Sequence, residues 1–174
     1  MKQQRRRWKI ATEAGYAGKI LRVDLSSGRV TDLPTRDYAD KFIGGRCIAA
    51  KIYWDEVSPD INAFDTENQL IFVTGPLAGF SGLSGSRWQV CGKSPSVEQF
   101  SHSNAGGSWG AWLKFAGYDG IVIQGKSDKP VYLFLQDGTA EIKDASTLWG
   151  KGSIETRDIL KGELRSDVRV VAIG

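Results

Sequence analysis

Apolar and polar residues alternate with a period of about two in several short stretches, which is the pattern of strands with one buried face. Residues 18–25 and 29–33 show this alternation on either side of Ser26-Ser27-Gly28, so they predict a β-hairpin. The compact apolar run at 69–74 predicts a buried strand. Further strands are predicted at 87–91, 120–124, 130–135, 140–143 and 168–173.

Helical segments are predicted between these strands, at 35–42, 48–54, 110–116 and 153–164. Thr35 or Asp37 can cap the first helix, Gly44-Gly45 ends it, and Gly117 ends the third. About eight or nine strands and three or four helices in irregular order favour an α+β fold over a doubly wound sheet.

The composition indicates one domain with a real core, because 41% of the 174 residues are hydrophobic. The net charge of +3 comes from the leader, residues 1–14, whose first ten residues include five basic and no acidic side chains. Residues 11–174 carry 18 basic and 20 acidic side chains, which is not the pattern of a nucleic-acid-binding surface. For the leader we favour a disordered tail over a basic arm for RNA or an anionic membrane.

Export and membrane insertion are not expected. An arginine run occurs at 5–7, but no apolar segment follows it as in a twin-arginine signal. No stretch approaches the roughly 20 apolar residues of a membrane span. The cysteines, Cys47 and Cys91, are predicted to be two buried free thiols, and they suggest a reducing, cytoplasmic setting.

The residues supply few candidates for catalysis. Cys47, Cys91 and the single histidine, His102, do not have the spacing of a closed zinc or iron–sulfur site. His102 has no neighbouring nucleophile pattern, and we interpret it as an ordinary loop histidine. We therefore predict no catalytic and no metal-ligating residue in this chain.

Two loops rich in glycine and serine carry the more informative chemistry. The first spans 75–87 and ends at Arg87, and the second spans 103–110 and leads into a helix. Glycine lets the backbone approach a ligand closely, the guanidinium of Arg87 suits a phosphate, and Asn104 offers one acceptor and two donors. The loops could form a cradle for a large anionic cofactor or could be ordinary tight turns, and the residue pattern alone does not decide.

Several segments in order resemble the tungsten-dependent aldehyde ferredoxin oxidoreductase family, and the resemblance covers about residues 15–174. The motifs that carry it are Gly75-Pro-Leu-Ala-Gly79, Ser86-Arg87, Lys93-Ser-Pro95, Asn104-Ala-Gly-Gly107, Leu113-Lys-Phe-Ala-Gly-Tyr-Asp119, the hairpin at 18–28 and the segment at 142–151. The resemblance implies a β-rich amino-terminal domain of two packed mixed sheets with a few helices. It also implies that 15–174 binds a bis-pterin tungsten (or molybdenum) cofactor through Arg87, Asn104 and Gly106, with Ala105 and Gly107 adjacent.

The resemblance further implies an activity that this chain cannot perform alone. The family oxidises aldehydes to carboxylic acids and passes the electrons through a [4Fe–4S] cluster to ferredoxin. The cluster ligands lie in later domains, and neither cysteine here matches them. The chain also stops on the apolar run before Gly174, so we expect a truncated domain, completed by the remaining domains or by a companion chain, with homo-oligomers left open. The alternatives are a non-catalytic pterin carrier and an interaction domain; the substrate and the choice of metal stay open.

Overall fold

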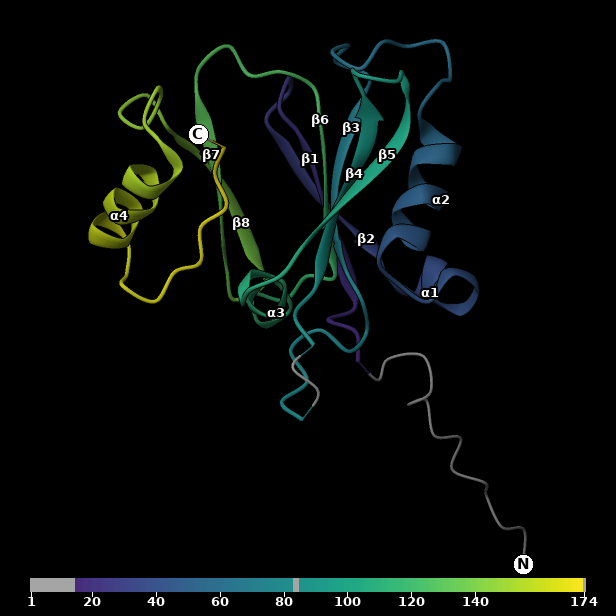
Figure 1. Ribbon diagram of the computed structural model, residues 1–174, viewed down its shortest axis with the longest axis horizontal. Coiled ribbons are helices and arrows are strands. Elements are labelled where there is room, and N and C mark those ends of the chain that lie inside the picture. The colour runs from purple at the N-terminus through teal and green to yellow at the C-terminus, as the bar shows by residue number, and fades with distance from the viewer. Residues whose placement is uncertain (1–14, 83–84, 174) are drawn as a thin grey trace, which may run out of the picture.

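The computed structural model describes residues 15–82 and 85–173, and it has a mixed six-stranded sheet at its centre (Figure 1). The predicted leader, 1–14, lies outside the described residues. The strand order is β2-β1-β6-β3-β4-β5, in which β1 and β6 are parallel and all other neighbours are antiparallel. The strands are β1 (Lys19–Asp24), β2 (Arg29–Pro34), β3 (Gln69–Thr74), β4 (Trp88–Ser94), β5 (Gln99–Ala105) and β6 (Gly120–Gln124).

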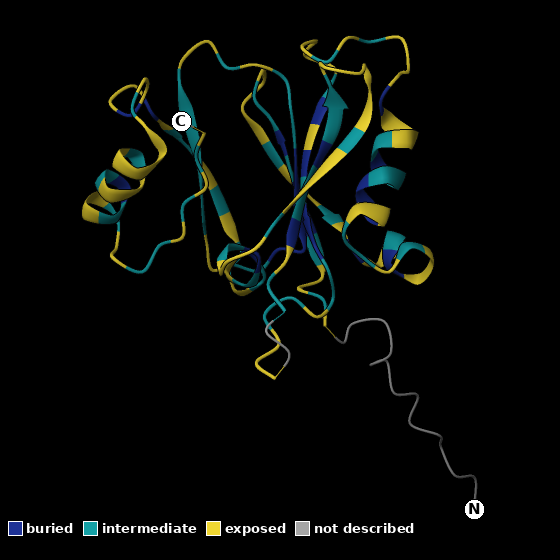
Figure 2. Ribbon diagram, viewed as in Figure 1, coloured by how far each residue is buried: buried dark blue, intermediate teal, exposed yellow. Residues whose placement is uncertain are grey.

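Two helices cover one face of this sheet. Helices α1 (Arg36–Phe42) and α2 (Arg46–Glu56) lie against it, and Ile48 and Ile52 of α2 are buried on Ile71 of β3. Alternation along the strands supplies this core, because every second residue of β1, β3 and β6 faces the helices. Figure 2 shows the resulting concentration of buried residues in the central strands.

A small second sheet covers the other face. It is the hairpin of β7 (Val131–Gln136) and β8 (Thr139–Asp144), whose apolar side chains pack with Leu21, Val23 and Ile121 of the large sheet. Helix α4 (Ser153–Glu163) packs on the outer side of this hairpin. The layers confirm the predicted α+β fold with two packed sheets, and the described residues contain four helices and eight strands.

An aromatic cluster closes one end of the large sheet. Helix α3 (Trp109–Phe115) begins there. The ring centroid of Trp109 lies 4.5 Å from that of Trp88 and 5.9 Å from that of Phe72. Offset and tilted rings at such separations stabilise a core beyond simple burial. The same end of the sheet carries both glycine-rich loops.

Four predictions about local structure were wrong. Residues 168–173 form no strand, whereas 99–105 form the edge strand β5, which takes the place of the first three residues of the second predicted loop, 103–105. His102 consequently lies in a strand rather than in a loop. Of the two thiols predicted to be buried, Cys91 is buried and Cys47 is exposed.

Among the described residues, no helix is both long and apolar enough to cross a membrane.

Candidate functional site

The pairing of the strands brings the two glycine-rich loops to the same end of the sheet. Thr74 at the end of β3 pairs with Trp88 at the start of β4, and Trp88 pairs with Ala105 at the end of β5. Loop one (75–87) joins the first two of these positions, and loop two, now shortened to 106–108, leaves from the third. Loop one therefore ends on β4 and loop two begins on the adjacent strand β5, as a shared cradle requires.

Contacts with α3 and β4 fix the ends of the two loops. The backbone N–H of Ala111, in the first turn of α3, donates to Ser86 Oγ at 3.2 Å. Trp88 Nε1 donates to the carbonyl of Gly106 at 3.1 Å. A Cβ placed at Gly110 would lie only 2.6 Å from the backbone oxygen of Ser86, so this junction requires glycine. The start of α3 is thus fixed against the end of loop one.

A third glycine segment lies beside the described part of loop one. Within loop one, the N–H of Gly79 donates to the carbonyl of Gly85 at 2.7 Å. The N–H of Gly45 donates to the carbonyl of Thr74 at 2.9 Å, and a Cβ at Gly44 would lie 2.9 Å from Pro76. From the sequence we interpreted Gly44-Gly45 only as a helix break, and its proximity to loop one was missed.

The predicted cofactor-binding residues are arranged along this sheet end. Arg87 is exposed immediately before β4, and Asn104 is exposed near the end of β5, with Ala105 half-buried beside it. Gly106 and Gly107 are exposed, and no atom lies within 4 Å of the Cβ position of either residue. Gly107 has a φ of 78°, a conformation that favours glycine. The structure therefore brings all five residues to the same end of the sheet and leaves the backbone of loop two open to a ligand.

Polar neighbours that the sequence analysis did not identify hold Asn104 in place. Gln89 donates through Nε2 to Asn104 Oδ1 at 2.9 Å, and its own Oε1 accepts the N–H of Arg46 at 2.6 Å. The guanidinium of Arg46 lies 2.7 Å from His102 Nε2. The pairing of β4 with β5 places Gln89 opposite Asn104, and the sequence analysis missed this cross-strand relation because it assigned 103–110 to a loop.

The residues at this end of the sheet suit ligand binding rather than catalysis. It combines the positive charge of Arg87 and Arg46, amide donors and an accessible glycine backbone, which together suit an anionic, polar-ringed group. Because α3 has only seven residues, we attribute no separate anion site to its dipole. Cys91 of β4 is buried in the sheet. Loss of hydration raises the pKa of its thiol to about 11, so the thiol is neutral.

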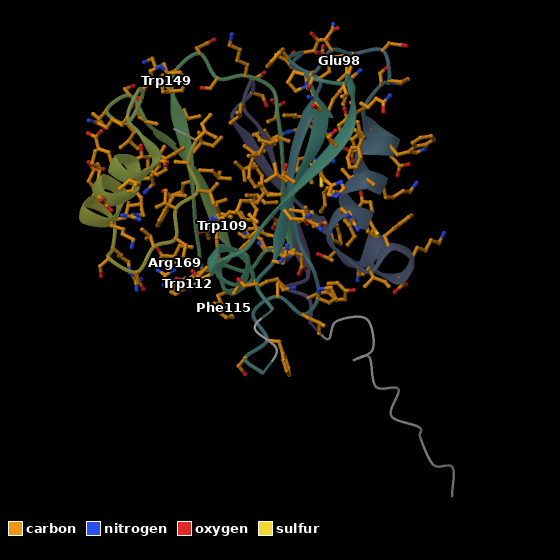
Figure 3. The ribbon with its side chains drawn as sticks, in the orientation of Figure 1. Glu98, Trp109, Trp112, Phe115, Trp149 and Arg169 are labelled. Atoms are coloured by element: carbon orange, nitrogen blue, oxygen red, sulfur yellow. The ribbon has the colours of Figure 1, made fainter. Side chains whose placement is uncertain are left out.

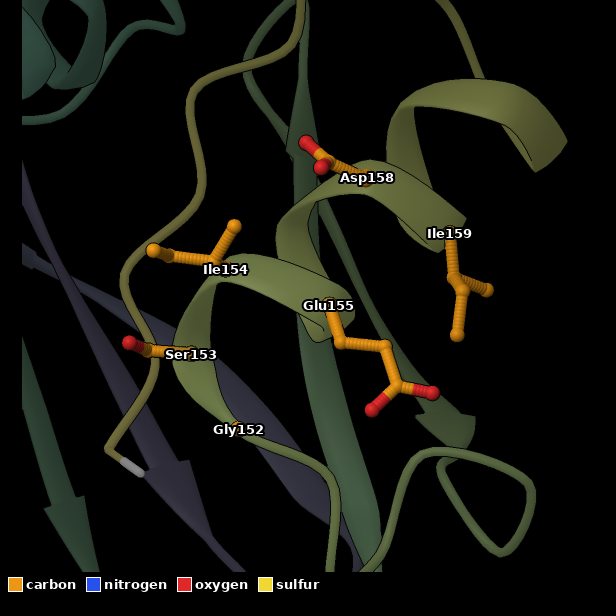
Figure 4. Close-up of a pocket in the computed structure, with 6 residues that line it drawn as sticks. All are labelled: Gly152, Ser153, Ile154, Glu155, Asp158 and Ile159. Carbon is orange, nitrogen blue, oxygen red and sulfur yellow. The ribbon is translucent and has the colours of Figure 1, made fainter.

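Two other features of the described residues offer no competing site. No group of three or more His, Cys, Asp or Glu side chains there is placed to hold a metal ion. A surface hollow of about 850 Å³ follows the first turns of α4 (Figure 4). Its side chains are those of Ser153, Ile154, Glu155, Asp158 and Ile159, which form no nucleophile–base pair in the hydrogen bonds of the described residues.

Comparison with known proteins shows which family this chain resembles over most of its length. The family described as aldehyde ferredoxin oxidoreductase, N-terminal domain, matches residues 20–174. A tungsten-containing aldehyde ferredoxin oxidoreductase of Pyrococcus horikoshii is 44% identical over 162 residues, which are 92% of this chain and 27% of the relative. The WOR-like subunit of an aliphatic sulfonate oxidoreductase from Pyrococcus furiosus is 38% identical over 88% of this chain and 25% of the relative.

A solved structure is also similar. It is the active site complex BamBC of benzoyl coenzyme A reductase with 1,5-dienoyl-CoA, with a TM-score of 0.85 and 40% identity over 88% of this chain and 24% of the other. The chain thus spans about a quarter of the length of the relatives it matches.

Proposed function

Because the chain belongs to the aldehyde ferredoxin oxidoreductase family and is part of an enzyme of that family, we propose that it supplies one wall of a bis-pterin cofactor site. The enzyme is then a tungsten- or molybdenum-dependent oxidoreductase that converts aldehydes to carboxylic acids. The observation that carries the proposal is the meeting of loops one and two at one sheet edge, with an exposed glycine backbone between Arg87 and α3.

Each side chain at this edge has a definite role in the proposal. The guanidinium of Arg87 would hold a phosphate of the cofactor through charge-assisted hydrogen bonds. Since Gln89 already uses Oδ1 of Asn104, the Nδ2 hydrogens of that residue are its donors for the polar ring. Gly106 and Gly107 let the ring approach the backbone, where any larger side chain would intervene.

The remaining chemistry lies outside this chain. The cofactor supplies a metal centre held by the pterin dithiolenes, and the protein supplies placement and charge. We place the [4Fe–4S] cluster and the substrate channel in the other domains or in a companion chain, with ferredoxin as the electron acceptor and the cytoplasm as the location.

The test uses the complete enzyme and measures its cofactor content directly. Arg87→Ala removes a charge-assisted interaction of the kind that contributes ~1.5–3 kcal/mol, so pterin and metal should be retained at least about tenfold more weakly. Arg157→Ala, which changes an exposed arginine of α4, is the matched control and should retain both. Metal is measured by elemental analysis, and extracted pterin by fluorescence.

Three outcomes separate the proposal from its alternatives. Loss of pterin in Arg87→Ala, at an unchanged unfolding temperature of the cofactor-free protein, supports the assigned role. Full pterin and metal in Arg87→Ala contradict that role. An enzyme that holds pterin but transfers no electrons to ferredoxin with any aldehyde is the non-catalytic carrier instead.

A further inference from the structure

The start of α2 lies against polar side chains of β4 and β5. Gln89 of β4 pairs with Asn104 of β5, and two residues away Cys91 pairs with His102. Cys91 belongs to the core under α2, and alternate residues of a strand share one face, so these four side chains all lie on the α2 side of the sheet. Glu98, in the turn between the two strands, marks the other end of this ladder in Figure 3.

The hydrogen bonds of Gln89 have a direction that the backbone dictates. The backbone N–H of Arg46, the first residue of α2, donates to Gln89 Oε1 at 2.6 Å. A backbone N–H can only donate, so the oxygen of this amide must face Arg46 and its Nε2 must face the other way. Nε2 donates to Asn104 Oδ1 at 2.9 Å. The oxygen of the Asn104 amide is therefore turned toward Gln89, and its Nδ2 is turned away.

The start of α2 is itself attached to three strands, so Arg46 is a fixed reference for this chain of bonds. The N–H of Gly45 donates to the carbonyl of Thr74, at the end of β3, at 2.9 Å. A Cβ on Gly45, whose φ is 56°, would lie 2.9 Å from Gln89 Oε1, so the backbone touches the amide directly. The Arg46 guanidinium lies 2.7 Å from His102 Nε2 on β5, and arginine has no acceptor, so that nitrogen accepts.

We propose that Gln89 is a positioning residue that sets the polarity of the cofactor site. Anchored by the start of α2, it turns the amide of Asn104 so that the site offers a donor and selects a ligand group that accepts. A ring carbonyl or an unprotonated ring nitrogen of a pterin is such a group. The reversed amide would present Oδ1 and reject it. This inference rests on the proposed function, because it specifies which atoms of the cofactor meet Asn104.

Gln89→Glu in the complete enzyme reverses the amide while keeping the size of the side chain. The ionised carboxylate still accepts from Arg46, but it cannot donate, so Asn104 must turn Nδ2 toward it and Oδ1 toward the ligand. We expect pterin to be retained at least about tenfold more weakly than in the wild type at pH 8. Retention relative to the wild type should recover as the pH falls toward 5, since the protonated carboxyl donates to Asn104 again. Pterin is extracted after gel filtration at each pH and measured by fluorescence.

Two further variants separate amide reversal from simpler effects. Ser103→Glu adds the same charge beside Asn104 but on the opposite face of β5, and it should weaken retention by less than about threefold. Gln89→Met neither donates nor accepts and leaves Asn104 free to adopt both orientations. It should weaken retention by about two- to fivefold at every pH, and it replaces Gln89→Glu if that variant does not assemble. The unfolding temperature of each cofactor-free variant reports on folding.

The outcomes distinguish this inference from the proposed function. A loss of pterin in Gln89→Glu that exceeds the loss in Ser103→Glu, and that recovers at lower pH, supports the positioning role. Equal losses in these two variants, or in Gln89→Glu and Gln89→Met at every pH, overturn it. Full pterin in Gln89→Glu with loss in Arg87→Ala overturns this inference alone, whereas full pterin in both overturns the proposed function as well.

Discussion

Asp119→Asn should destabilise the domain by about 3–5 kcal/mol, because it breaks a buried ion pair on one side only. The side chain of Asp119 is 5% exposed, and that of its ion-pair partner, Lys114, is 8% exposed. Oδ1 accepts from Lys114 Nζ and from the N–H of Ala17 at 2.9 Å. Oδ2 accepts from the N–H of Gly18 at 2.9 Å and from Thr35 Oγ1 at 2.6 Å. One side chain thus joins the start of β1, the start of α1 and the end of α3.

The magnitude follows from this geometry. An asparagine presents one acceptor and one donor group where the carboxylate presented two acceptors, so donors on one side lose their partner. Lys114 keeps a hydrogen bond to the carbonyl of Gly15 at 2.6 Å but loses its counter-charge in a nearly closed site. A charge-assisted hydrogen bond contributes ~1.5–3 kcal/mol, and the losses overlap, so they do not add.

Urea unfolding monitored by tryptophan fluorescence measures the effect. Asp128→Asn, at an exposed carboxylate, is the control and should change the free energy of unfolding by less than about 0.5 kcal/mol. Thr35→Val removes a single donor and should cost about 1–3 kcal/mol. Lys114→Met combined with Asp119→Asn should be more stable than Asp119→Asn alone, since no unpaired charge is then buried. A loss below 1 kcal/mol for Asp119→Asn would refute this account of the cluster.

Other expectations concern the thiols and the glycines. In the native chain Cys47 should react with a thiol reagent at pH 8 and Cys91 should not. Thiol titration of Cys47→Ser and of Cys91→Ser measures each remaining thiol separately, and equal reaction rates would contradict the burial of Cys91. Because burial raises the pKa of Cys91 from 9.0 to about 11, stability that is fully present below pH 9 should fall as the pH rises to 11, and Cys91→Ala should show a smaller fall in its urea midpoint. Gly110→Ala should destabilise the domain by roughly 1–3 kcal/mol through its clash with Ser86, whereas Gly162→Ala, in open space on α4, should leave the thermal midpoint unchanged or higher; equal midpoints would contradict the close approach at Gly110.

The strands with one buried face could be predicted from the sequence, and the exceptions have physical reasons. Strand β5 (Gln99–Ala105) is mostly exposed at the edge of the sheet, so its polar sequence carries no alternation to detect. The segment 168–173 alternates like a strand but pairs with none. Instead Val170 packs against the cluster under α4, and Arg169 contacts Ser108 and Trp112. Periodicity records which face is buried, whereas pairing depends on a partner elsewhere in the chain.

The loops of the candidate site could be predicted from the sequence, but the contacts that hold them in place could not. The two loops were identified from glycine content and from a family resemblance, and the register of β3, β4 and β5 is what makes them neighbours. The contacts of Ser86 with the start of α3, and of Gln89 with Asn104, link residues that are 15 to 25 positions apart. No local pattern in the sequence indicates such contacts, because each partner is an ordinary polar residue.

The position of β6 in the sheet has a consequence for synthesis of the protein on the ribosome. The hairpin of β1 and β2 and the antiparallel β3, β4 and β5 are connected in the sheet only through β6, which lies between β1 and β3. A growing polypeptide therefore exposes two separate half-sheets, each with an unpaired apolar edge, until Gln124 has left the exit tunnel. Pairing of β1 with β6 closes a loop of about 100 residues, which makes it a late and slow step of folding. Any folding helper for this domain would act in that interval.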